Sequence, residues 1–257
     1  MSQAAPEPAP APPPARPRRQ PRSRSRPAAG FGAREVVLGW CLWLIGSWGL
    51  VLAHQGLAPA VAAGPVHRRM SLMALVGMTA VWPAVRLSQE ARDAWGRPTG
   101  GGLPRREVLL DWFALNAVFQ AVLWPMAFVS RWSARQALLL GATLAAWSLL
   151  AGLITAWGRS TASGGARAAA MAGCLAVLLL EPLALFGVAA ATGAGWGGLP
   201  DLRLSPLQAV WAFSGPPARF AWADPAFAYR TAGVAAAAAL GWLVFLLLGP
   251  RGFRGTR

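Results

Sequence analysis

Polar side chains inside long apolar runs are the residues with the most chemistry to offer: Asp111, Asn116, Gln120 and Glu181. Glu181 precedes Pro182 in the stretch LLLEPLALF, and a carboxylate at mid-membrane costs roughly 2.5–3.5 kcal/mol to insert. The proline also leaves a carbonyl of the preceding turn without its usual donor. Two roles fit these residues: a substrate or hinge position, or a side chain that hydrogen-bonds a neighbouring helix.

A packing role is favoured for two of the other polar residues in these runs. Asn116 and Gln120 are four positions apart, so they share one face of a helix and are predicted to be partners. Asp111 lies close to the start of its run. It can reach water there, or form an ion pair with Arg105 or Arg106.

Catalytic and metal-binding motifs are sparse. The chain has no lysine, which excludes a Walker A phosphate loop and a Schiff-base lysine. Cys41 and Cys174 lie in apolar runs, and two histidines without an HExxH or CxxC motif predict neither a metal nor another cofactor. A hydrolase would have to pair Ser214 with His54 or His67, and Ser214 lacks a GxSxG elbow. The sequence therefore predicts no enzyme and no catalytic residue.

Composition indicates which solvent surrounds the chain. Of its 257 residues, 55% are hydrophobic and 13% charged, against about a quarter charged in soluble domains. Apolar runs close to the ~20 residues that cross a bilayer recur six times. They cover residues 36–56, 70–88, 108–130, 135–157, 168–192 and 231–249. We therefore predict an all-α integral membrane protein, a bundle of six transmembrane helices within residues 34–250.

The ends of the chain are predicted to be tails. Residues 1–33 are rich in proline and arginine, so they are expected to be a disordered cytoplasmic tail. The functional alternative to a merely solvated tail is attraction to anionic lipid headgroups. The stretch 6–30 has no aromatic residue for base stacking, which argues against a specific nucleic-acid partner. The run at 36–56 is of span length, so we expect a retained anchor rather than a cleaved signal peptide. Residues 251–257 form a short basic tail.

Arginine placement predicts the orientation. With the amino terminus inside, the inner segments carry 17 arginines and the outer segments seven, as the positive-inside rule expects. Both termini are therefore predicted to be cytoplasmic, in the inner membrane. A long outer loop, 193–230, then joins spans five and six. Its aromatic stretches SPLQAVWAF and ARFAWADPAFAY predict short helices at the outer interface.

The inner loop, 89–107, resembles a known pattern. RLSQEARDAWG followed by LPRREVLLDW is similar to the loop between spans two and three of type 2 ABC transporter permeases, which have six spans. In that family the loop contacts a separate ATPase subunit, and re-entrant helices precede the sixth span. The resemblance implies a coupling role for Glu90, Arg92, Asp93, Pro104, Arg105, Arg106 and Glu107.

The resemblance gives the functional expectation. The chain would be a permease-like membrane subunit that works with an ATPase supplied by another chain and with a second permease copy or paralogue in the lipid bilayer. The alternative is a membrane scaffold or regulatory protein that does not transport and acts through its basic tail and inner loop.

Overall fold

The computed structural model describes residues 33–55, 63–89, 105–161, 163–192, 205–215 and 225–248, and all of its elements there are helical. Six helical segments of this part are long and apolar enough to cross a membrane, which confirms the predicted helical fold with six candidate spans. The elements are α1 (Ala33–Gln55), α2 (Ala63–Val76), the π-helical turn η2 (Gly77–Val81), α3 (Trp82–Ser88), α4 (Arg105–Val129), α5 (Ala134–Ser160), α6 (Gly164–Thr192), α7 (Pro206–Phe213) and α9 (Pro225–Leu248).

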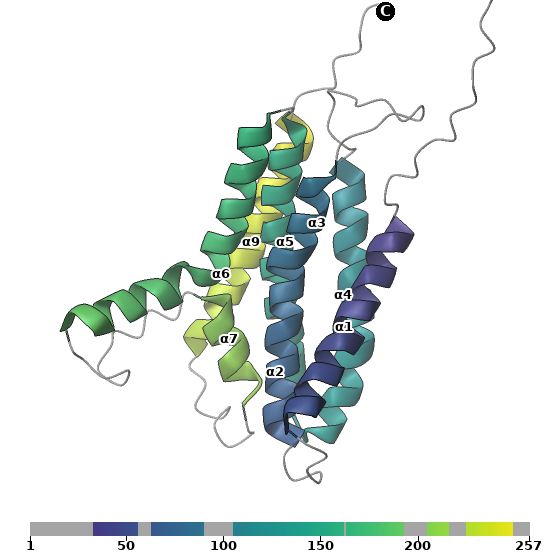
Figure 1. Ribbon diagram of the computed structural model, residues 1–257, viewed down its shortest axis with the longest axis vertical. Helices are drawn as coiled ribbons and strands as arrows, with labels where there is room; N and C mark the ends of the chain where they lie inside the picture. The colour runs from purple at the N-terminus through teal and green to yellow at the C-terminus, as the bar shows by residue number, and fades with distance from the viewer. Residues whose placement is uncertain are drawn as a thin grey trace, which may run out of the picture.

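The long helices stand side by side and alternate in direction (Figure 1). α1 begins and α9 ends at the same end of the bundle, which we call the terminal end; the opposite one is the distal end. The other long helices alternate between the two ends, so α3 finishes and α4 starts at the terminal end. This arrangement brings together the helix ends that border residues 90–104.

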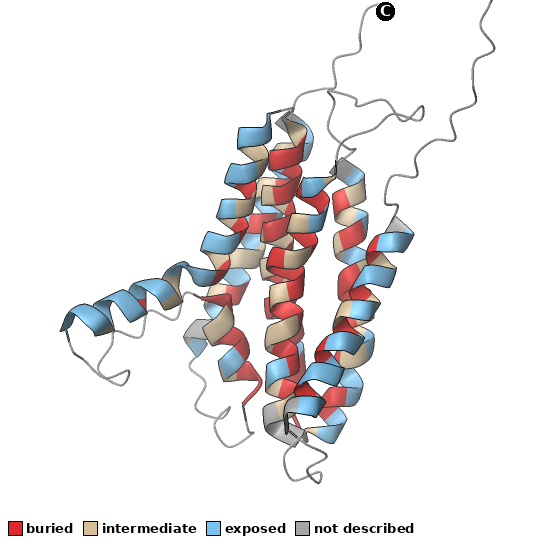
Figure 2. Cartoon of the chain, in the orientation of Figure 1, coloured by how far each residue is buried: buried red, intermediate tan, exposed pale blue. Residues whose placement is uncertain are grey.

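The centre of the bundle is α5. It packs against α9, α6, α4 and α7, and also against η2 and α3. Figure 2 shows buried residues concentrated on α5 and on the α2–α3 segment, whereas α1 and α6 turn exposed faces outward. Large exposed side chains on these faces are apolar, for example Leu42, Ile45 and Leu180. Such faces suit lipid as the surrounding solvent.

The second candidate span is longer than the sequence predicted. The expected segment began at residue 70, but the helix begins at Ala63 and continues to Ser88 through η2. In η2 the backbone N–H of Trp82 donates to the Gly77 carbonyl, five residues earlier. Pro83 follows directly, and its ring would clash with the carbonyl four residues before it in a regular α-helix. A wider π turn at this point accommodates the proline.

A tight turn joins α4 to α5. The Trp132 N–H donates to the Ala127 carbonyl at 2.9 Å and the Arg131 N–H to Phe128 at 3.2 Å, the two bonds of a Schellman motif. Arg131 occupies the left-handed position with φ 55°, where glycine is usual. Ser133 then caps α5 by accepting from the Gln136 N–H at 3.1 Å. These local bonds make α4 and α5 antiparallel neighbours.

The region before the last span is only partly as predicted. The stretch SPLQAVWAF forms α7, capped by Ser205, and buried residues such as Val210 and Phe213 pack it into the bundle against α5 and α2. In the second predicted stretch, Pro225–Tyr229 are the first residues of α9 instead of a separate short helix. Residues 218–224 lie outside the described ranges.

The second half of α6 departs from the bundle. Figure 1 shows this helix bending so that its C-terminal half points away from the other helices. Pro182 lies inside α6, and proline is a standard cause of sharp kinks. Leu183 and Phe186, just beyond it, are 62% and 60% exposed. Most side chains beyond Pro182 are exposed, although Leu185 is buried.

Candidate functional site

The strongest polar feature of the bundle is a buried ion pair between α3 and α4. Arg86 Nε lies 2.5 Å from Asp111 Oδ2, and Arg86 Nη2 lies 2.7 Å from Asp111 Oδ1. This is the bidentate fork that guanidinium and carboxylate groups form most favourably. The two residues are 2% and 1% exposed. Asp111 was expected to face water or to pair with Arg105 or Arg106, so its actual partner corrects that expectation.

Two further residues extend the ion pair. Arg86 Nη1 donates to Gln89 Oε1 at 3.0 Å, and Arg159 Nη1, from the end of α5, donates to the backbone carbonyl of Arg86. The last carbonyls of a helix lack partners within it, so a cation satisfies this one well. We call Arg86, Asp111 and Arg159 the charged lock, because they connect α3, α4 and α5.

The charged lock lies at the base of the predicted inner loop. α3 ends two residues after Arg86, and α4 begins six residues before Asp111, roughly 9 Å along a helix. Removing one partner of a buried ion pair costs about 3–5 kcal/mol, because the other charge is left uncompensated. The lock therefore holds together the two helices that border residues 90–104.

The predicted coupling residues are described only in part. Glu90, Arg92, Asp93 and Pro104 lie outside the described residues. Arg105 begins α4, although its side chain is not described. Two more of these residues have described side chains in the first turn of α4: Arg106 is exposed and Glu107 is half-buried. An exposed arginine at this position is accessible to a partner chain.

Asn116 bonds to α5 instead of its predicted partner Gln120. Its Nδ2 donates to the Trp112 carbonyl at 2.8 Å and to Ser148 Oγ at 3.3 Å. Trp112 Nε1 donates to the same serine oxygen at 3.0 Å. Gln120 is half-buried, with its amide beside Gly141 of α5. A packing role for Asn116 was foreseen, but its partner was not.

Tryptophan side chains connect several helices through hydrogen bonds. Four indole N–H groups each donate to a backbone carbonyl of another helix, all at 3.1 Å. The donors are Trp40, Trp43, Trp112 and Trp242, and the acceptors are Leu115, Met73, Ala145 and Leu149. A buried indole needs such a partner. None of these bonds was predicted, because their partners are 30 to 93 positions apart in the chain.

α5 carries buried polar residues that sequence analysis missed: Gln136, Thr143, Ser148, Thr155 and Arg159. Four of them bond to other helical elements or to the residues beside them. Gln136 Nε2 donates to the Phe213 and Gly215 carbonyls at 2.8 and 2.7 Å, and Thr143 Oγ1 lies 3.1 Å from Thr231 Oγ1 of α9. Residues 136 and 143, and residues 148 and 155, are seven apart. That two-turn spacing was the available sequence signal.

Glu181 immediately precedes Pro182, the proline inside α6. The residue is half-buried, and both carboxylate oxygens are shielded from solvent without a hydrogen-bond partner in the described part. The predicted alternative in which Glu181 bonds to a neighbouring helix is therefore not observed among these residues. An unpartnered buried carboxylate is costly, and such groups in membrane spans are functional candidates.

The serine and histidine residues considered for hydrolysis are arranged differently from that hypothesis. Ser214 Oγ donates to the Val210 carbonyl at 2.5 Å, within its own helical turn. His67 Nδ1 instead bonds to Ser130 Oγ, just after the C-terminal end of α4. Free carbonyls gather at that end of a helix, whereas an oxyanion needs N–H donors. His54 has no described side chain.

Metal ligands are not grouped in the described ranges: no three His, Cys, Asp or Glu side chains there lie close enough to hold an ion. Comparisons with protein-family models, with curated proteins and with solved structures find no match. The arrangement that remains as a functional candidate is the charged lock, together with Glu181 beside Pro182.

Proposed function

We propose that this chain is the permease-like membrane subunit of an ATP-driven transporter, with the ATPase supplied by a separate chain. It would lie in the cytoplasmic membrane as a dimer or beside a paralogue. Six helices of span length support this proposal, as does the similarity of the inner loop to type 2 ABC permeases. A chain without lysine also has no Walker A motif of its own, so it needs an ATPase partner.

The terminal end of the bundle is the proposed cytoplasmic end. The segments assigned to the inside hold 17 of the 24 arginines. Exposed Arg106 and half-buried Arg167 belong to first turns of helices at that end. This distribution supports an inner location for both termini.

The charged lock is the observation that carries the proposal. An ATPase that binds residues 89–107 would exert force on α3 and α4 together, because the ion pair of Arg86 and Asp111 stops these helices from separating. Arg159 would pass the displacement to the central helix α5. The bend beside Pro182 then offers α6 a point at which to move, so that a pathway opens alternately to the two sides.

Purification in a mild detergent, followed by identification of co-purifying chains, tests the proposal. A stoichiometric nucleotide-binding subunit is expected. Arg106→Glu should release that subunit, because it reverses an exposed charge beside the inner loop. Arg135→Glu is the matched control: each arginine is exposed and is the second residue of its helix, but Arg135 lies at the distal end. Glutamate suits a first turn in both helices, so neither variant should lose stability.

Two outcomes contradict the proposal. The first is a wild-type protein that retains no ATPase when purified gently. The second is that Arg106→Glu and Arg135→Glu retain the same amount of ATPase, because binding would then not depend on the inner loop.

The alternative function is a non-transporting membrane scaffold. The polar side chains of α5 favour the scaffold function. Gln136, Thr143 and Arg159 bond to other elements instead of lining a transport pathway. A scaffold would co-purify with partners that are not ATPases and that bind the basic tail. The same purification therefore separates the two functions.

A further inference from the structure

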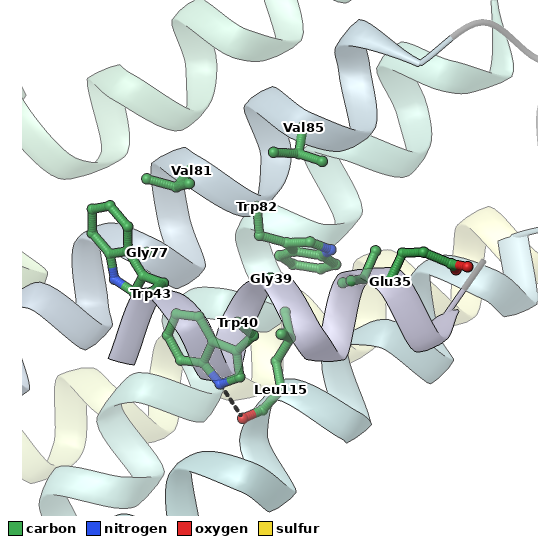
Figure 3. Close-up of a pocket in the computed structure, with 10 residues that line it drawn as sticks. Glu35, Gly39, Trp40, Trp43, Gly77, Val81, Trp82, Val85 and Leu115 are labelled. Carbon is green, nitrogen blue, oxygen red and sulfur yellow. Dashed lines mark hydrogen bonds between the residues drawn. The ribbon is translucent and has the colours of Figure 1, made fainter. Parts of the chain in front are cut away.

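A cavity of about 330 Å³ lies between α1 and the segment formed by η2 and α3 (Figure 3). Its walls are apolar apart from Glu35, and three tryptophans, Trp40, Trp43 and Trp82, contribute to them. Ligand pockets of roughly 300–1,000 Å³ are typical of small-molecule sites. The cavity lies between two candidate membrane spans, so lipid is the medium that surrounds it.

Trp82 is the exception among the tryptophans of this wall. Trp40 and Trp43 donate their indole N–H groups to carbonyls on neighbouring helices. Trp82 is 4% exposed, yet its Nε1 is buried without a hydrogen-bond partner among the residues that the structure describes. Figure 3 shows this nitrogen on the side of the ring that faces Glu35. A buried donor without an acceptor costs about 1–3 kcal/mol, which an acceptor inside the cavity would offset.

Glu35 gives the cavity a charge preference. It lies in the first turn of α1, and its side chain is exposed while lining the cavity. Its carboxylate attracts an ammonium group. A headgroup that carries only a phosphate would be repelled by it.

We propose that this cavity binds a membrane phospholipid with an amine headgroup. One acyl chain lies among the tryptophan rings, a glycerol ester carbonyl accepts the Trp82 N–H, and the ammonium group pairs with Glu35. The apolar walls, the unpartnered donor and the carboxylate match the three parts of such a lipid. This inference does not depend on the proposed transport function.

Gly39 allows the cavity to be filled without a clash. It lines the cavity, and a Cβ placed on it meets no other atom within 4 Å. Gly46 is a matched control, because its Cβ would also meet nothing within 4 Å and it lies two turns further along α1, outside the cavity wall. Gly77 is unsuitable, since a Cβ there would come within 2.4 Å of the Trp40 ring.

The experiment is native mass spectrometry of the detergent-purified full chain, mixed with equal amounts of dioleoyl phosphatidylethanolamine and dioleoyl phosphatidylglycerol. The wild type and Gly46→Leu are expected to retain one phosphatidylethanolamine. Gly39→Leu should retain at least about tenfold less phosphatidylethanolamine, because the leucine side chain displaces several acyl-chain methylenes from the tryptophan walls. Equal retention by Gly39→Leu and Gly46→Leu overturns the proposal.

Two further variants test the polar contacts. Glu35→Gln should keep one bound lipid but take up the two headgroups equally, and an unchanged preference overturns the role of the ammonium group. Trp82→Phe keeps an aromatic ring and removes the donor, so retention should fall about tenfold. The same spectra report oligomers. The wild type could instead bind neither lipid and form a dimer that is lost in Gly39→Leu. That result would show that a second copy of the chain occupies the cavity, and it would overturn the proposal.

Discussion

α5 and α6 are adjacent helices of 27 and 29 residues that use polar side chains in opposite ways. Half of the candidate membrane span in α5 is buried, compared with 17% of the span in α6. Each buried polar side chain of α5 makes at least one hydrogen bond, most of them to another element, although Gln136 Oε1 has no partner in the described part. α6 carries Glu181 beside Pro182, with both carboxylate oxygens unpartnered in the described part.

The difference shows what organises a bundle in lipid. Apolar side chains distinguish poorly between lipid and protein neighbours, because both surroundings are hydrocarbon. Polar groups do distinguish, since each needs a partner that lipid cannot offer. α5, whose polar side chains form several bonds to other elements, lies at the centre of the bundle, whereas α6 carries a carboxylate with neither oxygen partnered in the described part.

The largest expected difference in the free energy of unfolding is between variants of two carboxylates. Asp111→Leu removes the carboxylate that binds Arg86 at two nitrogen atoms and should lower the free energy of unfolding by about 3–5 kcal/mol. Glu181→Leu removes a carboxylate that has no partner in the described part, so its free energy of unfolding should stay equal or rise. Unfolding in a denaturing detergent, measured by circular dichroism, gives both values.

The double variant Arg86→Leu/Asp111→Leu is the control for this prediction. It removes both charges and should recover most of the loss, because well-packed apolar groups often replace a buried ion pair at little cost. Equal losses for Asp111→Leu and Glu181→Leu would contradict the distinction between the two sites.

A smaller loss is expected at the distal end of α5. Gln136→Leu leaves the Phe213 and Gly215 carbonyls without their donor and should cost about 1–3 kcal/mol. Hydrogen exchange should also become faster in α7, because these bonds fasten its C-terminal end. Gln120→Leu is the control: Gln120 is half-buried and makes no hydrogen bond to another described helix. Unchanged exchange in α7 after Gln136→Leu would show that apolar packing alone holds that helix.

The sequence predicted the membrane-spanning segments, whose length is set by the bilayer. It did not predict the side-chain contacts between residues far apart in the chain. Six apolar runs predicted the six candidate spans, because span length is fixed by membrane thickness. The start of the second span was missed, because the predicted run began at residue 70 and left out Arg68. In the structure it belongs to α2 and stacks on the Trp211 ring, with its guanidinium carbon 4.0 Å from the ring centroid.

The candidate site was less predictable than the spans. Asp111 was identified from its place in an apolar run, but Arg86, near the end of the run 70–88, was not singled out. Their pairing depends on how α3 and α4 pack, over a separation of 25 positions. Local patterns carry no information on such a contact. The bend at Pro182 was predictable, since it depends on one residue and its own helix.

A still smaller effect is expected for the contact between α5 and α9. The Thr143 hydroxyl donates to the Leu139 carbonyl, so Thr231 supplies the proton between the two threonines. Thr143→Val should cost about 0.6 kcal/mol, the average for hydrogen bonds between membrane helices. A double-mutant cycle with Thr231→Val measures the coupling. Zero coupling would mean that packing alone joins α5 to α9.

The smallest effect on stability, and the one most informative about function, is expected from Glu181→Gln. Glutamine has nearly the same shape and still forms hydrogen bonds, but it carries no charge. Glu181 has no bond to lose in the described part, so the amount of purified protein and its free energy of unfolding should equal those of the wild type. If the charge of Glu181 is needed for α6 to move beside Pro182, ATP hydrolysis by the complex with the co-purified ATPase should fall to its uncoupled level. Gly187→Ala serves as the control, because it lies beyond the bend and a Cβ there meets nothing within 4 Å. Wild-type hydrolysis and transport in Glu181→Gln would show that Pro182 alone sets the bend and that α6 needs no charge to move.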